Sequence, residues 1–234
     1  MELIETLRKA GIIPVIVIED AEQAVPLARA LVKGGLPVLE VTFRTAAAAD
    51  AIARIKAEVP EAVVGAGTLL APAMVKAAKA AGAVFGVAPG FDPAVLAAAR
   101  EAGLEMVPGV ATASELSQAL TAGVKMVKFF PAEAAGGVKM IKNLLGAFRF
   151  TGVTFMPTGG VNLSNVADYL AVPEIVCCGG TWIVPKDALA KGDWAVIEKL
   201  AADAARNASE RRNGTNSKQS FNPGRSRRCR KINR

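Results

Sequence analysis

Short runs rich in Val and Ile alternate with longer Ala-rich segments along most of this sequence. The short runs are apolar throughout, as strands buried on both faces of a parallel sheet are, and the longer segments repeat their apolar residues with the period of an α-helix. The pattern predicts eight strands, at residues 12–18, 38–42, 63–65, 84–87, 106–110, 126–130, 154–157 and 175–178. Eight helices are predicted after them, at residues 21–33, 46–58, 71–81, 93–101, 113–122, 137–145, 163–170 and 194–205. A chain of this kind folds as repeated βα units around a parallel sheet.

Eight βα units are the parts of a (β/α)8 TIM barrel, and we predict one such α/β barrel over residues 1–206, with an additional helix before the first strand. The length of 234 residues and the hydrophobic content of 52% suit a single domain of this size. The main alternative is an open, doubly wound sheet. Such a sheet would carry a GxGxxG loop after its first strand, whereas here the fragment Gly65-Ala66-Gly67-Thr68 follows the third strand.

The formal charge of +7 arises from the C-terminal end of the chain. Residues 207–234 contain nine Lys or Arg and one Glu, net +8, which leaves 19 bases and 20 acids, net −1, for the other 206 residues. This segment has few large apolar side chains, so we predict a disordered, low-complexity basic tail. A flexible basic tail suffices for weak polyanion binding, so an alternative function is a barrel scaffold whose tail binds nucleic acid or another polyanion. The alternative, favoured by the lack of interleaved aromatic residues, is an extension without function.

Histidine is absent from the sequence, which excludes His-based acid–base catalysis and the usual zinc ligand sets. The three cysteines, Cys177, Cys178 and Cys229, form no metal-ligand pattern and fit reduced thiols in a cytoplasmic protein. The N-terminus lacks the apolar stretch of a signal peptide, and no run approaches the roughly 18 apolar residues that a membrane span needs. We therefore expect a cytoplasmic protein with no metal and no membrane partner.

One lysine lies inside an apolar run, where a charged ammonium group is costly. Lys128 occupies the middle of the predicted strand at residues 126–130. Burial favours the neutral amine, which is a nucleophile toward carbonyl carbon. The alternative is a lysine whose stem packs while its amine reaches water. Lys125, three residues earlier, is expected to be a solvated surface charge. The central position of Lys128 favours Schiff-base chemistry.

Glu40 is a carboxylate in the second predicted strand. Residues alternate between the two faces of a strand, so Glu40 shares one face with Val38 and Thr42. A carboxylate pointing outward, between sheet and helices, would lack a partner at high cost in free energy. We therefore predict that Glu40 points into the barrel, where it is the main candidate for proton transfer.

Two glycine-rich corners follow the seventh and eighth predicted strands. They are Thr158-Gly159-Gly160 and Gly179-Gly180-Thr181. The corners after strands 7 and 8 are where barrels of this type commonly bind phosphate through backbone N–H groups. A Gly-Gly pair serves equally well in a tight turn. Two such pairs in the expected places favour a phosphate site.

Six motifs follow one another in the sequence: VLEVTFRT at residues 38–45, VGAGT at 64–68, PGVAT at 108–112, KFFPAE at 128–133, PTGGV at 157–161 and GGTW at 179–182. In this order they resemble the 2-keto-3-deoxy-6-phosphogluconate (KDPG) and 4-hydroxy-2-oxoglutarate aldolase family, and the resemblance extends over residues 12–205. It implies a class I aldolase on a (β/α)8 barrel. It also implies a homotrimer that needs no metal or organic cofactor.

The resemblance assigns a role to each matched residue. It implies that Lys128 forms the Schiff base, that Glu40 transfers protons, and that Arg44 with Thr68 holds the pyruvate carboxylate. It further implies that the pocket is lined by Pro89 and Phe130, and that phosphate is bound by Thr158, Gly159, Gly160, Gly179, Gly180 and Thr181.

The implied reaction is cleavage of KDPG to pyruvate and glyceraldehyde 3-phosphate. The galactonate epimer and 4-hydroxy-2-oxoglutarate remain alternative substrates, because the motifs do not fix the configuration at C4. Two positions depart from the family pattern. Thr181 stands where serine is common, which implies tighter phosphate contacts, and Ala135 replaces a residue that is often polar, which implies a changed substrate preference.

Overall fold

The structure is a computed structural model that describes the backbone of residues 2–219 and the side chains of residues 3–209. Its helices are α1 (Glu2–Ala10), α2 (Ala24–Lys33), α3 (Ala48–Glu58), α4 (Pro72–Ala80), α5 (Pro93–Glu101), α6 (Ala113–Thr121), α7 (Gly137–Phe148), α8 (Val166–Leu170), α9 (Lys186–Lys191) and α10 (Trp194–Gln219). Two 3-10 helices are η1 (Ala21–Gln23) and η2 (Arg149–Thr151). The strands are β1 (Ile12–Ile16), β2 (Val38–Thr42), β3 (Val63–Gly67), β4 (Phe85–Val87), β5 (Glu105–Val107), β6 (Gly109–Val110), β7 (Met126–Phe129), β8 (Thr154–Pro157) and β9 (Cys178–Gly180).

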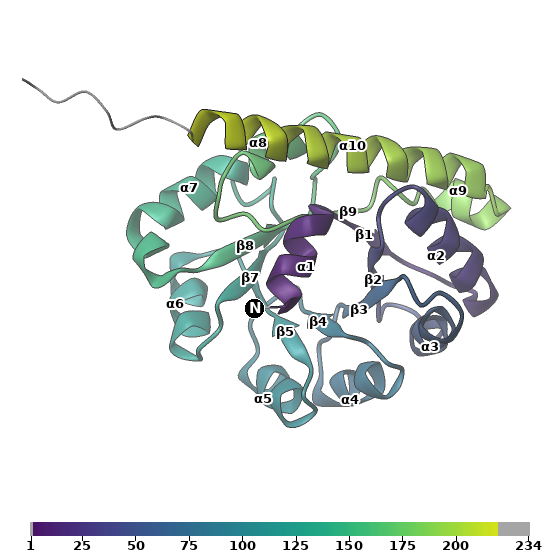
Figure 1. The fold of residues 1–234 in the computed structure, drawn as a ribbon. Helices are drawn as coiled ribbons and strands as arrows, with labels where there is room; N and C mark the ends of the chain where they lie inside the picture. The colour runs from purple at the N-terminus through teal and green to yellow at the C-terminus, as the bar shows by residue number, and fades with distance from the viewer. Residues whose placement is uncertain (1, 220–234) are drawn as a thin grey trace, which may run out of the picture.

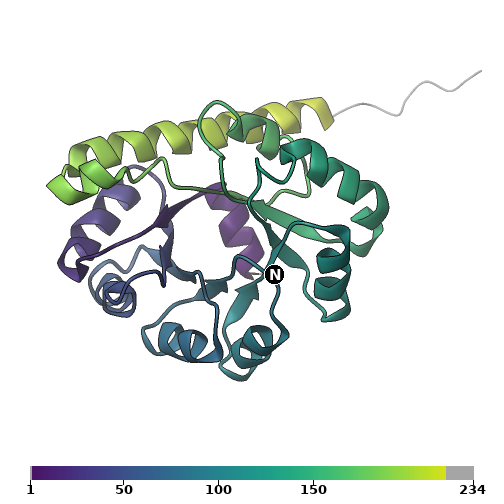
Figure 2. The ribbon, with the colours of Figure 1, turned by 180° about the vertical axis from the view of Figure 1, so that it is seen from behind.

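The strands form a ring of parallel strands, with α2 to α10 around it (Figures 1 and 2). One run of strands has the order β5-β4-β3-β2-β1-β9, and a second has the order β6-β7-β8. Parallel bridges from Phe155 to Ile175 and from Thr158 to Gly179 join β8 to β9. On the other side the runs meet at Pro108, between β5 and β6. The prediction of a TIM barrel with an N-terminal helix is confirmed.

Several element boundaries differ from the predicted ones. The predicted strand at residues 106–110 is divided into β5 and β6, because Pro108 has no N–H to donate to a neighbouring strand. The last strand begins at Cys178 rather than residue 175. The helix predicted from residue 163 begins at Val166, because the Asn162 side chain accepts bonds from the backbone and the side chain of Ser164 and holds a turn there. The helix α9 was not predicted.

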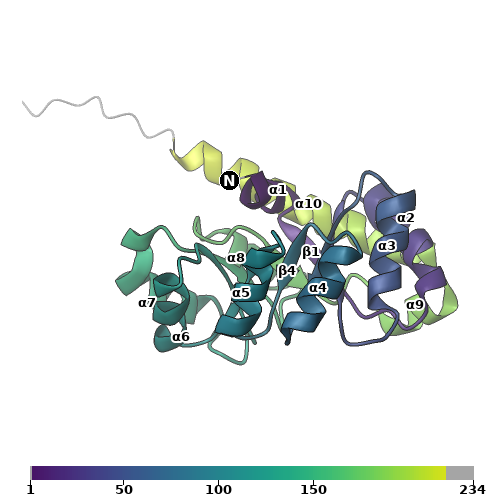
Figure 3. The same cartoon turned by 90° about the horizontal axis from the view of Figure 1, so that it is seen from below.

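The helix α1 covers one end of the barrel (Figure 3). Its buried residues Leu3 and Leu7 belong to the apolar cluster that also contains Ile13, Val38 and Phe85 from the strands. Because α1 directly precedes β1, this is the end at which the strands begin. The catalytic end of such a barrel is the opposite one.

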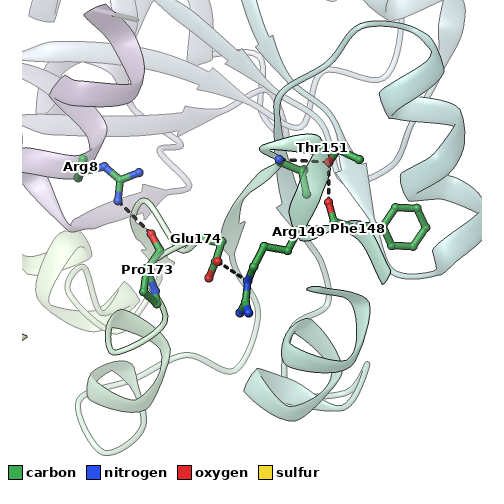
Figure 4. A network of polar contacts seen from close by, with 7 residues as sticks. Arg8, Phe148, Arg149, Thr151, Pro173 and Glu174 are labelled. Carbon is green, nitrogen blue, oxygen red and sulfur yellow. Dashed lines mark hydrogen bonds and ion pairs between the residues drawn. The ribbon is translucent and has the colours of Figure 1, made fainter. Parts of the chain in front are cut away.

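Polar contacts also hold this closed end together (Figure 4). Arg8 of α1 donates a hydrogen bond to the carbonyl oxygen of Pro173, at 3.2 Å. The neighbouring Glu174 forms an ion pair with Arg149 of η2, with 2.6 Å between Nε and Oε1. The loop before β9 is thus fixed between α1 and η2.

The last helix extends beyond the predicted domain boundary. A disordered tail was predicted from residue 207, but α10 continues to Gln219. Packing accounts for its passage through residue 207, since Ala201, Ala204 and Ala208 are buried. The close approach to α2 requires Gly34, where a Cβ would lie 2.5 Å from the Cβ of Ala201. The rest of the predicted tail, residues 220–234, lies outside the described residues. Within residues 2–219, no helix has the length and apolar character needed to cross a membrane.

Candidate active site

Lys128 and Glu40 meet inside the barrel. Lys128 lies on β7 and Glu40 lies on β2, and their side chains are 5% and 0% exposed. The Lys128 Nζ donates a hydrogen bond to the Glu40 Oε1 at 3.2 Å. Both side chains therefore point inward, and neither the snorkelling lysine nor the outward glutamate that the sequence left open is found. An amine and a carboxylate in this arrangement can exchange a proton with each other and with a bound molecule.

Gly67 on β3 makes room for the Glu40 side chain. Glu40 is paired with Gly65 and Thr42 with Gly67 in the register of β2 and β3. A Cβ at Gly67 would lie 2.3 Å from the Glu40 Oε1, closer than any real contact. Thr42 Oγ1 donates a hydrogen bond to the carbonyl oxygen of Ile16, at 2.8 Å, which ties β2 to β1. Because Gly67 has no side chain, the Glu40 carboxylate can occupy this space inside the barrel.

Each member of the pair has one further notable feature. The Lys128 Nζ lies 5.4 Å from the centre of the Phe130 ring, within the range of a cation–π contact. The second oxygen of Glu40, Oε2, is buried and has no hydrogen-bond partner among the described residues. A buried carboxylate oxygen without a partner is costly. It is therefore suited to accept a hydrogen bond from a substrate hydroxyl or a water molecule.

Arg44 and Thr68 lie together just past the ends of β2 and β3. The Arg44 Nε donates a hydrogen bond to the Thr68 Oγ1 at 3.2 Å, and Arg44 is exposed. Thr68 has a φ of 58°, a left-handed conformation that is rare outside glycine. Backbone conformations of this kind occur often at binding sites. The contact brings together the two residues that were predicted to hold a carboxylate.

The two predicted glycine corners adjoin each other. Thr158 forms a parallel bridge with Gly179, and a Cβ at Gly179 would lie 2.4 Å from the Thr158 Oγ1. Thr158 is 4% exposed, and its Oγ1 has no hydrogen-bond partner among the described residues. Gly159 and Gly160 have φ values of 100° and 81°. Only glycine adopts such values without strain, so the backbone can approach a ligand closely here.

The other predicted residues surround these groups. Thr181 is exposed directly after β9, and Gly180 packs against the Trp182 ring, where a Cβ would lie 1.8 Å from a ring carbon. Pro89 follows β4 and lies against Gly109, where a Cβ would be 2.1 Å from the Pro89 carbonyl oxygen. Gly109 in turn is the β-sheet partner of Lys128. Every residue predicted for the site thus lies within a strand of the barrel or shortly after one.

Two residues near the corners were missed by sequence reasoning. Tyr169 of α8 donates a hydrogen bond to the Glu133 Oε1, and Glu133 lies in the loop after β7. Burial, followed by this bond to Glu133, raises the pKa of Tyr169, which therefore stays protonated. Glu133 belongs to the KFFPAE motif, but nothing in its spacing indicated a partner 36 residues away.

The described residues contain no group of three or more His, Cys, Asp or Glu side chains that could hold a metal ion. Cys177 and Cys178 are both buried. Burial raises the pKa of Cys178, so this thiol is not a nucleophile at neutral pH.

A lysine paired with a carboxylate at the centre of a (β/α)8 barrel, beside an arginine at the strand ends and two glycine corners, defines a lysine-dependent, class I aldolase. Known proteins agree with this. The family model described as KDPG and KHG aldolase matches residues 3–200. The chain belongs to the KDPG and KHG aldolase family.

The similarity to individual relatives covers most of both chains. The 2-dehydro-3-deoxy-phosphogluconate aldolase of Treponema pallidum is 46% identical over 85% of this chain and 94% of the relative. The KHG/KDPG aldolase of Escherichia coli is 49% identical over 86% of this chain and 94% of the relative.

Solved structures show the same fold. The KDPG aldolase of Legionella pneumophila has a TM-score of 0.81 and 42% identity, covering 85% of this chain and 96% of that one. It was solved with pyruvate captured as a covalent carbinolamine intermediate. The KDPG aldolase of Zymomonas mobilis, solved with 3-phosphoglycerate, has a TM-score of 0.81 and 43% identity, covering 88% of this chain and 96% of that one.

Proposed function

We propose that this chain cleaves KDPG to pyruvate and glyceraldehyde 3-phosphate through a Schiff base at Lys128. The observation that carries the proposal is the buried contact between the Lys128 Nζ and the Glu40 Oε1. A buried amine beside a carboxylate is the pair that imine chemistry requires, because the amine must lose its proton before it attacks a carbonyl. The carbinolamine of pyruvate in the Legionella relative supports the same chemistry.

The first step uses Lys128 as a nucleophile. Its neutral amine attacks the C2 carbonyl of the substrate and forms a carbinolamine, which loses water to give an iminium ion. The iminium draws electrons from the C3–C4 bond, which breaks and leaves an enamine on the lysine. Protonation at C3 and hydrolysis of the imine then release pyruvate and free the amine.

Glu40 supplies the proton transfers. Its carboxylate takes the proton of the C4 hydroxyl as the C3–C4 bond breaks, directly or through one water, and later returns a proton to C3 of the enamine. Oε2, which has no hydrogen-bond partner in the part of the chain that the structure describes, is the oxygen available for this, since Oε1 accepts from Lys128. One carboxylate serves both steps, in a chain that has no histidine.

Residues that follow the strands orient the substrate. Arg44, held against Thr68, pairs with the carboxylate of the 2-keto acid and directs its ketone toward Lys128. The corners at residues 158–160 and 179–181 bind the phosphate at the other end of the substrate through backbone N–H groups. Pro89 and Phe130 line the space between these ends.

A substrate panel tests this function. Pyruvate release should be measured for KDPG, its galactonate epimer and 4-hydroxy-2-oxoglutarate, each at a range of concentrations. We expect the highest kcat/KM for KDPG, because it alone combines the phosphate with the gluconate configuration at C4. A higher kcat/KM for either alternative would assign the chain to that substrate. No pyruvate release from any of them would contradict the proposal.

The assembly and setting that accompany this function are a homotrimer in the cytoplasm. The resemblance of the motifs to the family supports both. Light scattering on the purified full chain should give three times the mass of 24.2 kDa. A monomeric mass would contradict the trimer without affecting the proposed chemistry.

A further inference from the structure

The only tyrosine of the chain is almost completely buried beside the glycine corner after β8. Tyr169 is 1% exposed and donates a hydrogen bond to the Glu133 carboxylate. It reaches from α8, which follows the corner in sequence, to the loop that follows β7. The bond therefore joins two segments on either side of the Thr158–Gly160 backbone, outside the residues to which the mechanism gives a role.

Glu133 is tied to this corner through its backbone as well. Its N–H donates to the Gly159 carbonyl oxygen at 3.0 Å, and the N–H of Ala132 donates to the Thr158 carbonyl oxygen at 2.8 Å. The stem of the Glu133 side chain lies against Gly160, where a Cβ would be 2.7 Å from the Glu133 Cβ. The position of Glu133 and the path of the corner therefore depend on each other.

The start of α7 encloses the pair from a third side. A Cβ at Gly137 would lie 3.2 Å from the Glu133 Oε1 and 3.4 Å from the Tyr169 hydroxyl oxygen. Gly137 has a φ of 62°, and its N–H donates to the Ala132 carbonyl oxygen at 2.8 Å. The hydroxyl–carboxylate bond is thus the side-chain connection between the loop after β7 and α8, in contact with the first residue of α7.

We propose that Tyr169 and Glu133 are positioning residues, which fix the Thr158–Gly160 corner in the conformation that binds the substrate phosphate. The inference rests on the proposed function and deepens it, because it assigns the phosphate selectivity to a side-chain pair beyond the phosphate contacts. Glycines with positive φ do not hold their own conformation, since the glycine backbone has many accessible states. A bond to a charged acceptor is stronger than one between neutral groups and fixes the geometry.

The Tyr169 bond has a second effect, on charge. A carboxylate close to a bound phosphate repels it, and the repulsion grows as the carboxylate approaches. The hydrogen bond from the Tyr169 hydroxyl keeps the Glu133 Oε1 beside α8 and next to Gly137, the first residue of α7. When this hydroxyl is removed, the carboxylate becomes free to turn, so phosphate binding loses both a fixed corner and a restrained negative charge.

The test compares Tyr169→Phe and Glu133→Ala with the wild-type enzyme on KDPG and on unphosphorylated 2-keto-3-deoxygluconate. We expect Glu133→Ala to raise the KM for KDPG about tenfold, the value of one charge-assisted hydrogen bond, and Tyr169→Phe to raise it by at least as much, because the freed carboxylate also repels the phosphate. In both variants kcat and the unphosphorylated reaction should change by less than about twofold. Glu133→Gln keeps an acceptor for the tyrosine and removes the charge, so it should restore a KM within about threefold of wild type.

Controls separate positioning from a general loss of structure. Thr151→Val removes a hydroxyl that donates to the Phe148 carbonyl oxygen at the opposite end of the barrel, and it should leave both substrates unaffected (Figure 4). Borohydride trapping with pyruvate, which has no phosphate, should proceed as in wild type in all variants. Glu133 is exposed, so Glu133→Ala decides the question if Tyr169→Phe does not fold.

The possible outcomes are distinct. Equal losses on both substrates, or an unchanged KM for KDPG, would overturn the positioning role. A wild-type enzyme that traps pyruvate but does not prefer the phosphorylated substrate would also overturn it, while the Schiff-base function would stand. A wild-type enzyme that does not trap pyruvate would overturn the proposed function itself.

Discussion

A missing side chain at position 67 allows Glu40 to reach Lys128. The VGAGT motif places Gly67 beside Thr42 in the sheet, and its Cβ position lies 2.3 Å from the Glu40 Oε1. Glycine in a strand usually weakens it, since it has no side chain to pack and loses more conformational entropy. Here the space left by the glycine is filled by the carboxylate.

Gly67→Ala should therefore displace Glu40 with little change in the rest of the fold. We expect kcat to fall by a factor of about 10², the effect of a misplacement of about 1 Å in a catalytic group. Steady-state assays of pyruvate release measure it, with circular dichroism to confirm folding. The control is Gly146→Ala on α7, whose Cβ would have nothing within 4 Å. A Gly67→Ala enzyme with wild-type kcat would contradict the assigned role of Glu40.

The individual site residues were largely predictable. Lys128 was identified because a central position in an apolar strand forbids an unpaired charge, and Glu40 because the period of two leaves a strand residue only two directions. Tyr169 and Glu133 were not identified, because their contact depends on how two loops and a helix meet in space. Gly67 and Trp182 were quoted in motifs, but only the folded register shows what they pack against.

The helix α6 begins with a capping box. Thr112 accepts from the Glu115 N–H, and the Glu115 side chain accepts from the N–H groups of Ala111 and Thr112, at 2.8 and 2.9 Å. The bond from Ala111, aided by those from Thr112, lowers the pKa of Glu115 below its ordinary value of 4.5. A carboxyl with a lowered pKa in the folded state stabilises that state above its unfolded-state pKa and ceases to do so as the pH falls through its folded-state pKa.

Glu115→Gln should reveal this as a pH-dependent loss. The variant keeps an acceptor at the cap but loses the charge, so we expect its Tm to be lower than that of wild type at about pH 7, with a difference that shrinks as the pH is lowered toward about 3. Thermal unfolding followed by circular dichroism at both pH values measures the difference. Glu61→Gln, at an exposed loop position, is the control. A Tm difference that does not change with pH would show that the charge contributes nothing.

At the level of elements, the sequence predicted the alternation of strands and helices but not all their ends. Pro108 divides one strand, and the Asn162 turn shortens the helix that ends at Leu170. Both signals were present in the sequence, since proline cannot donate and asparagine favours turns. The helix α9 is only six residues long, which is too short for hydrophobic periodicity to reveal.

For the whole molecule, α10 shows how tertiary packing overrides composition. Residues after 207 are polar and basic, yet Ala208 is 3% exposed and the helix continues through this position. An isolated segment of this composition would not be helical, because helices of marginal sequence are stabilised by packing. The barrel therefore extends a little further along the chain than its composition suggests.

Two truncations test this boundary. A chain that ends at Ser209 should retain the activity and the Tm of the full chain, whereas one that ends at Arg206 loses the buried Ala208 methyl group and should be less stable by about 1 kcal/mol. Retention on heparin is measured alongside, because residues 210–234 contain all nine tail bases. If the chain that ends at Ser209 loses its retention on heparin but keeps full activity, this would support polyanion binding by the tail. Unchanged retention would favour an extension without function, and lost activity would contradict the boundary.

Trapping of pyruvate on Lys128 tests the central claim most directly. The full chain is incubated with pyruvate and sodium borohydride, digested, and examined by peptide mass spectrometry. We predict one reduced pyruvate adduct on Lys128, no adduct in Lys128→Met, and a normal adduct in Lys125→Met, which removes the exposed lysine at the start of the same strand. No adduct in the wild-type chain, or an adduct that persists in Lys128→Met, would contradict the account.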